Sequence, residues 1–153
     1  MQWLGIALAI VLVTLHLARV ARPREELKLI VSVMLIGGTW ETLLIGLSLL
    51  AYPSSMVIPG LAPFWLLALW ASFAAQFNTT YEWLKTRIYL AALLGAVAGP
   101  LSFRAGSALG AVRFVDPWPA AATLAVGWAI LLPLIVVLSR RWDGVQCQSL
   151  RHP

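Results

Sequence analysis

Long apolar runs separated by short polar turns make up almost the whole chain. Each run is close to the roughly 20 residues that an α-helix needs to cross a hydrocarbon core of about 30 Å. The pattern predicts five membrane-spanning helices and a polar tail, at about residues 1–19, 28–52, 60–78, 88–112, 118–139 and, for the tail, 140–153. We therefore expect an all-α, polytopic transmembrane helical bundle that forms a single integral membrane domain over residues 1–153.

The amino-acid composition supports this interpretation. Of the 153 residues, 61% are hydrophobic and 11% are charged, whereas soluble domains have about 45–50% and about 25%. A soluble globular domain is therefore excluded. The first run lacks the basic start and the small-residue cleavage site of a secretory signal, so we expect it to be a retained helix.

The basic residues predict how the bundle is oriented. Nine of the eleven Lys and Arg residues lie after the first run, after the third run or in the tail. They are Arg19, Arg22, Arg24, Lys28, Lys85, Arg87, Arg140, Arg141 and Arg151. Only Arg104 and Arg113 lie toward the other side. The positive-inside rule then places the N-terminus outside and the C-terminus in the cytoplasm. Because topology explains the positive charge, we expect no nucleic-acid partner.

The fourth run contains an unusual set of glycines. Gly95 and Gly99 are four residues apart, Pro100 follows directly, and Gly106 and Gly110 repeat the spacing. Glycines at this spacing share one helix face and allow another backbone to approach closely, while proline inside a helix removes a hydrogen bond and bends it. Two interpretations stay open: close packing with a bend, or a broken helix that lines a cavity.

Glu41 is an acidic residue in the middle of the second run. It lies thirteen residues beyond Lys28, which corresponds to about 20 Å along a helix. A lone charged carboxylate at such a depth costs several kcal/mol. Glu41 should therefore face the bundle, be protonated or have a partner.

Arg104 is the predicted partner of Glu41. It lies seventeen residues beyond Arg87, or about 25 Å along the fourth helix, which is a similar depth. The alternative is that Arg104 extends to the outer headgroups. Glu41 would then bond to Thr39, Thr42 or a backbone carbonyl.

A second polar group ends the third run, where Asn78 is either a helix-capping residue or part of a polar site. His16, near the same surface, is interpreted as an interfacial anchor.

Cys147 is the only cysteine, so an intramolecular disulfide is impossible and we expect a reduced thiol. His152 lies in the tail, and these ligands are too few for a metal site. No cofactor is expected.

Two segments, PFWLLALWASFAAQFNTTYEWL and LLGAVAGPLSFRAGSALGA, carry a family resemblance. They resemble a family of small uncharacterised bacterial inner-membrane proteins, a domain of unknown function with a Trp-rich helix ending in Asn and a Gly-Pro-Leu-Ser-aromatic segment. The family pattern falls on Trp65, Trp70, Phe73, Asn78, Trp83, Gly95, Gly99, Pro100, Ser102, Gly106 and Gly110, with its acidic residue on Glu41. The resemblance implies a multi-pass protein of the bacterial inner membrane. It also implies that the gene for this protein lies beside genes for enzymes that modify membrane fatty acids.

Three functions are compatible with these features. The leading hypothesis is a lipid-related accessory component or small enzyme, linked to envelope stress or fatty-acid modification, with membrane lipids as partners. Glu41 and Asn78 would be polar contacts in a cavity lined by the fourth helix. A small transporter or flippase would use Glu41 as a group that changes protonation. A structural subunit would bind a membrane-protein partner, or a second copy, through the glycine face of the fourth helix.

Overall fold

The computed structural model describes residues 2–53 and 58–145, and this part of the chain is mostly helical. The α-helices are α1 (Gln2–Arg19), α2 (Pro23–Gly46), α3 (Phe64–Ala74), α4 (Ile88–Ala108) and α5 (Pro117–Arg141), and a 3-10 helix, η1 (Glu82–Thr86), precedes α4. The all-α prediction missed one small feature. Strands β1 (Leu50–Ala51) and β2 (Arg113–Phe114) pair antiparallel, with Leu50 opposite Phe114.

Three helices, α2, α4 and α5, are long and apolar enough to cross a membrane. The helices α1 and α3 are apolar but shorter. The 11 residues of α3 extend only about 17 Å, so α3 is too short to cross a bilayer of ordinary thickness by itself. The helix lengths therefore support three spans and do not confirm the prediction of five.

The predicted boundaries of the second and third helices were wrong for local reasons. α2 begins at Pro23 because proline fits the first helical turn, where its missing N–H is not needed. It ends at Gly46, since Ser48 adopts a positive φ of 54° and turns the chain toward β1. α3 begins after Pro63 and ends at Ala74, and the chain continues through turns to η1.

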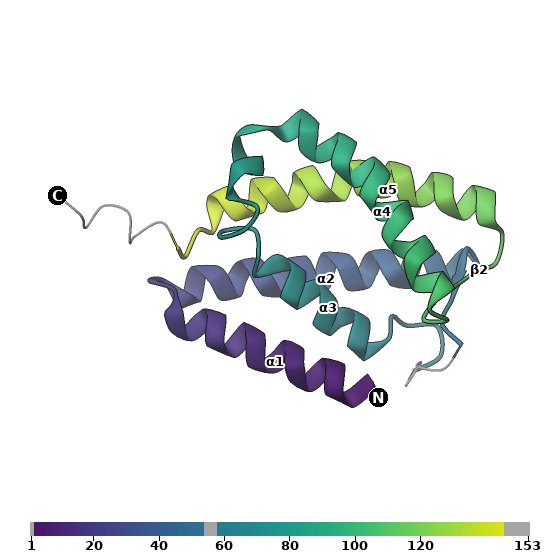
Figure 1. The fold of residues 1–153 in the computed structure, drawn as a ribbon, viewed down its shortest axis with the longest axis horizontal. Helices are drawn as coiled ribbons and strands as arrows, with labels where there is room; N and C mark the ends of the chain where they lie inside the picture. Colours follow the sequence, from purple (N-terminus) through teal and green to yellow (C-terminus); the bar gives the residue numbers. More distant parts are fainter. Residues whose placement is uncertain (1, 54–57, 146–153) are drawn as a thin grey trace.

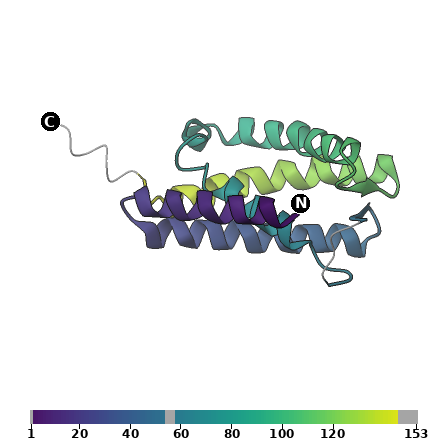
Figure 2. The ribbon, with the colours of Figure 1, turned by 60° about the horizontal axis from the view of Figure 1, so that its bottom comes forward.

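The helices are arranged in layers around α2 and α5, as Figures 1 and 2 show. α3 packs against both α1 and α2, and α4 packs against α5. In Figure 1, α4 crosses α5 at an angle and lies on the opposite side of the molecule from α1. The main partner of α4 is therefore α5, so a residue of α4 approaches α2 only if it lies on the face that Phe103 occupies.

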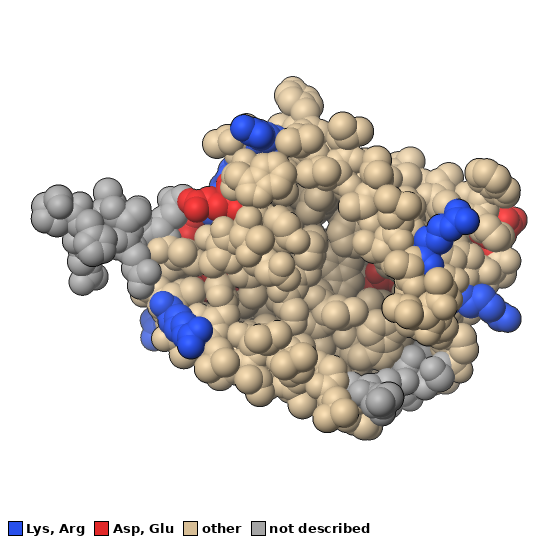
Figure 3. Space-filling model, in the orientation of Figure 1, with Lys and Arg blue, Asp and Glu red and all other residues tan. Residues whose placement is uncertain are grey.

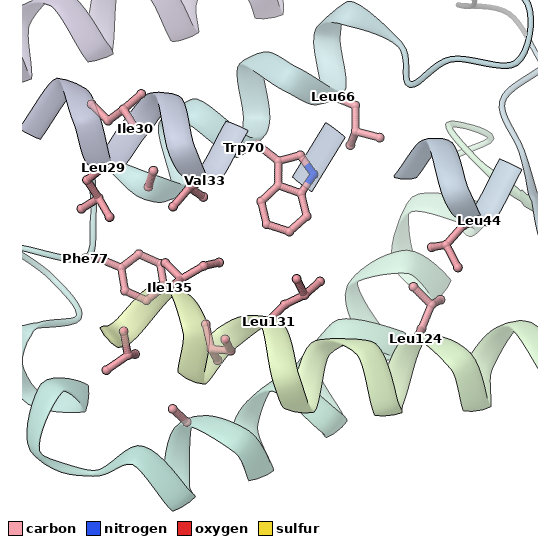
Figure 4. Close-up of a cluster of buried hydrophobic side chains, with 14 of the residues drawn as sticks. Leu29, Ile30, Val33, Leu44, Leu66, Trp70, Phe77, Leu124, Leu131 and Ile135 are labelled. Carbon is pink, nitrogen blue, oxygen red and sulfur yellow. The ribbon is translucent and has the colours of Figure 1, made fainter. Parts of the chain in front are cut away.

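The apolar core lies between α2, α3 and α5 (Figure 4). Leu29 and Val33 from α2, Trp70 from α3, and Leu124 and Ile135 from α5 are each at most 4% exposed. The outside is also apolar: large hydrophobic side chains are exposed along α1, α4 and α5. An apolar core inside an apolar surface is typical of a protein surrounded by lipid.

Charged residues gather at the two ends of the molecule and leave the middle of the face in Figure 3 almost free of basic side chains. The α1–α2 turn meets the end of α5 directly, since the Arg22 backbone N–H donates to the Gly144 carbonyl at 3.0 Å. The ammonium group of Lys85, a residue of η1, binds Asp143 at 2.6 Å. The basic segments that the sequence grouped together therefore lie at one end of the bundle.

Candidate functional site

Helix α2 carries Glu41 on its buried face, five residues before it ends. The Glu41 side chain is 0% exposed. The Tyr52 hydroxyl donates to its Oε2 at 2.8 Å, while Oε1 has no hydrogen-bond partner within the described part of the chain. Burial and the neighbouring Glu41 carboxylate raise the pKa of Tyr52 above its usual value, so the phenol stays a donor. A half-satisfied carboxylate is thus held inside the bundle.

The predicted pair between Glu41 and Arg104 does not form in this structure. Arg104 is exposed, and Glu41 is not a member of any ion pair seen among residues 2–53 and 58–145. The reason is the face of α4 that Arg104 occupies: α4 packs mainly on α5, and Phe103 lines the same hollow as Glu41, whereas Arg104 is on an exposed face. The exposure of Arg104 agrees with the alternative in which this side chain extends outward. Tyr52, which lies beyond the end of α2, was not among the predicted partners.

A hollow of about 320 Å³ opens beside Glu41 and is walled by Trp70 and Phe73 of α3, Phe103 of α4 and Trp128 of α5. A second hollow of about 400 Å³ shares Phe73 and Trp128 as walls and continues along α4. We call the two together the α3–α4 groove. Figure 3 shows a depression in the middle of this face, and Glu41 is the acidic residue in the lining of the first hollow. The groove is therefore an aromatic-walled space with one carboxylate.

Gly95 and Gly99 of α4 line one side of this groove. Gly95 lies so close to α5 that a Cβ there would overlap the Trp128 carbonyl oxygen, and a Cβ at Gly99 would overlap the Trp128 side chain. α4 is continuous through Pro100. The first two glycines therefore face α5 of the same chain, where a partner protein cannot reach them. Gly106 and Gly110 lie away from this contact, and Gly110 has a positive φ of 75° just after the helix ends.

Asn78 does not lie with Glu41, because it belongs to a different polar cluster near the start of α2. Its Nδ2 donates to Glu26 Oε2 at 2.8 Å and to the Trp142 carbonyl at 3.0 Å. Glu26 is 0% exposed. Its Oε2 also accepts the Gly144 backbone N–H at 3.1 Å, and its Oε1 lies 2.9 Å from His16 Nε2. We call these five residues the Glu26 cluster.

The Glu26 cluster corrects two predictions. His16 is a partner of a buried carboxylate and not only an interfacial anchor. Asn78 uses its amide to join segments that are far apart in sequence: it donates to the carbonyl of Trp142, the C-cap residue of α5, and to Glu26, so it does more than end its own helix. The sequence interpretation missed Glu26, which looks like an ordinary acidic residue of a first helical turn. Its spacing to Ile30 and Val33 places it on the buried face of α2, and this periodicity was the available signal.

Among the described residues, no group of three or more His, Cys, Asp or Glu side chains lies close enough together to hold a metal ion. Cys147 and His152 lie outside the described residues. The candidate site is therefore the α3–α4 groove with Glu41, and the Glu26 cluster is a separate polar feature.

Comparison with known proteins identifies a family but gives no activity. No curated protein and no solved structure matches the chain. A family model described as a protein of unknown function, DUF2878, matches residues 1–134. Since the match covers most of the chain, this protein belongs to the DUF2878 family.

Proposed function

We propose that this protein binds the acyl chain of a membrane lipid in the α3–α4 groove, and that it acts in lipid metabolism as an accessory component or a small enzyme. The observation that supports this proposal is a pair of neighbouring hollows that share Phe73 and Trp128 as aromatic walls, with a buried carboxylate in the lining of one of them. Each hollow lies within the range of about 300–1,000 Å³ that is typical of ligand sites. The proposal includes a multi-pass location in the bacterial inner membrane.

The chemistry of the walls favours an acyl chain over a polar solute. Trp70, Phe73, Phe103 and Trp128 offer ring surfaces, and the part along α4 adds Ala98 and the backbone of Gly99. The groove opens on a face whose middle is almost free of Lys and Arg (Figure 3). A lipid chain could therefore enter sideways from the bilayer without crossing a charged rim.

Glu41 supplies the polar contact at one end of the groove. Because Tyr52 already donates to Oε2, the carboxyl group is held in a fixed orientation with Oε1 left for another donor. A hydroxyl or amide of a lipid would satisfy that oxygen, and burial would strengthen the hydrogen bond. In either lipid-related role, Glu41 sets the position of the ligand along the groove.

A direct binding experiment uses a photoactivatable phospholipid with the reactive group in its acyl chain. The purified protein is reconstituted in nanodiscs with this lipid, irradiated, and analysed by peptide mass spectrometry. We expect crosslinks to α3 and α4 at the groove. Ala98→Phe fills the groove from an exposed position and should remove these crosslinks.

The matched control is Val97→Phe, which adds the same ring at the neighbouring residue, also exposed but not lining the groove. Crosslinks there should stay at the wild-type level. If Ala98→Phe keeps the groove crosslinks, or if both variants lose them equally, the groove does not hold the acyl chain.

The cellular role is tested by comparing membrane lipids in a deletion strain carrying wild-type protein, Glu41→Gln or no protein, at equal abundance and with and without oxidative stress. Glutamine keeps the size of the side chain but removes the charge. A lipid change that the wild type corrects and Glu41→Gln does not would support a lipid-related function. Identical lipids in all strains would refute it.

A second candidate function is a small transporter or flippase. The observation that favours it is the unpartnered Oε1 of a fully buried carboxyl group, because an ionisable group at membrane depth is commonly part of a transport pathway. Flux in proteoliposomes that depends on pH and disappears in Glu41→Gln would favour this function over lipid binding alone.

A further inference from the structure

A separate pocket of about 370 Å³ lies where α1 ends, on the side of the molecule that carries most basic residues. Its lining includes Leu12, Leu15, His16, Arg19, Thr79 and Val145. None of its lining residues lines the α3–α4 groove. We infer that this pocket binds the phosphate-bearing headgroup of an anionic membrane lipid.

The charge of the pocket favours an anion. Arg19 is exposed in the last turn of α1, and within the described part of the chain no Asp or Glu belongs to the lining. A guanidinium group can donate two parallel hydrogen bonds to one phosphate, which makes arginine well suited to this contact. The pocket therefore offers a cation that no carboxylate in its lining neutralises.

The position of the apolar residues distinguishes a lipid from free phosphate. Leu12 and Leu15 are 52% and 46% exposed and lie on the same helix as Arg19. Seven residues separate Leu12 from Arg19, which is about 10 Å along the helix axis. Acyl chains can thus lie on the leucines while the headgroup reaches the arginine. A small inorganic anion would gain nothing from the leucines.

The Glu26 cluster fixes the shape of the pocket. His16 forms one wall, and its Nε2 lies 2.9 Å from the fully buried Glu26 Oε1. Glu26 in turn accepts hydrogen bonds from Asn78 and from the Gly144 backbone. The last turn of α1 is therefore tied to α2, to the turn after α3 and to the end of α5. A wall fixed in advance lowers the cost of ordering the site on binding.

The experiment measures lipid selectivity of the full chain in nanodiscs that contain phosphatidylcholine and phosphatidylglycerol, by native mass spectrometry of retained lipids. We expect the wild type to retain phosphatidylglycerol preferentially. Arg19→Gln should lower this preference about fivefold, the effect of losing one basic contact near an anionic surface. Because Arg19 is exposed, this change should not disturb folding.

Arg24→Gln is the control, since Arg24 is an exposed basic residue at the same end that does not line the pocket. It should keep most of the preference. Equal losses in both variants, or no preference in the wild type, would overturn the proposal. So would binding of inorganic phosphate in neutral detergent that depends on Arg19 and matches the lipid in affinity.

Discussion

Glu26 and Glu41 lie on the same buried face of α2, near its two ends, and each carboxylate is bound by groups from other parts of the chain. Glu26 is surrounded by His16, Asn78 and the Gly144 backbone. The Tyr52 hydroxyl donates to Glu41, and the Trp70 side chain lies beside the same carboxyl group, while Oε1 has no hydrogen-bond partner among the described residues. A buried carboxylate without hydrogen-bond donors is costly. Both oxygens of Glu26 have partners, which is typical of a structural role, whereas Oε1 of Glu41 can still accept a hydrogen bond from a ligand.

Substitutions of Asn78 test the structural role of the Glu26 cluster. Asn78→Ala removes two hydrogen bonds from a buried position and should lower the free energy of unfolding by about 2–4 kcal/mol. Asn78→Asp should be worse, because it replaces the donor with a second carboxylate beside Glu26. Thermal unfolding in detergent measures both, with the exposed Thr80→Ala as control. A milder effect of Asn78→Asp than of Asn78→Ala would contradict this assignment.

Helix pairs in this bundle meet where a tryptophan of one helix lies on a glycine of the next. A Cβ at Gly37 would overlap Trp70, and one at Gly127 would overlap Trp40. Gly99 receives the Trp128 side chain in the same way, whereas Gly95 faces the Trp128 backbone carbonyl. Trp70 and Trp128 also stack, with ring centroids 5.1 Å apart. These contacts fix the distances between helices and at the same time build the aromatic wall of the groove.

Alanine substitutions along α4 test this packing. Gly95→Ala should destabilise most, because the obstructing atom is a backbone carbonyl that cannot rotate away. Gly99→Ala should destabilise less, because it meets the Trp128 side chain. At Gly106 the nearest atom is 3.4 Å from the added Cβ, so alanine should be neutral or stabilise by up to about 1 kcal/mol through helix propensity. Unfolding temperatures in any other order would argue against this geometry.

On the face drawn in Figure 3, Lys and Arg lie toward the two ends of the molecule, and large hydrophobic side chains are exposed along α1, α4 and α5 between them. The α1–α2 turn, the segment around η1 and the end of α5 are joined at one end by the Glu26 cluster and the Lys85–Asp143 ion pair. β1 and β2 close the other end. The segments of each end must therefore face the same side of a membrane, whichever side that is.

Cysteine labelling tests the orientation that the positive-inside rule predicts. In a Cys147→Ser background, Arg113→Cys, next to the strand pair, should react with a membrane-impermeant maleimide in intact cells. Thr80→Cys, near η1, should react only after permeabilisation. Both residues are exposed, so a difference reports sidedness and not burial. The reverse pattern would place the N-terminus in the cytoplasm.

The sequence by itself determined the class of the protein, the approximate positions of its helices and the grouping of its basic segments. These properties depend on apolar run length and on charge, which are local. Only the tertiary structure decided that Glu41 meets Tyr52 instead of Arg104, and that Glu26 collects donors from residues as far as 118 positions away. The physical reason is that such contacts depend on how the helices pack and on the face that each residue occupies: α4 packs mainly on α5, and its Phe103 reaches the space beside Glu41 while Arg104 is exposed.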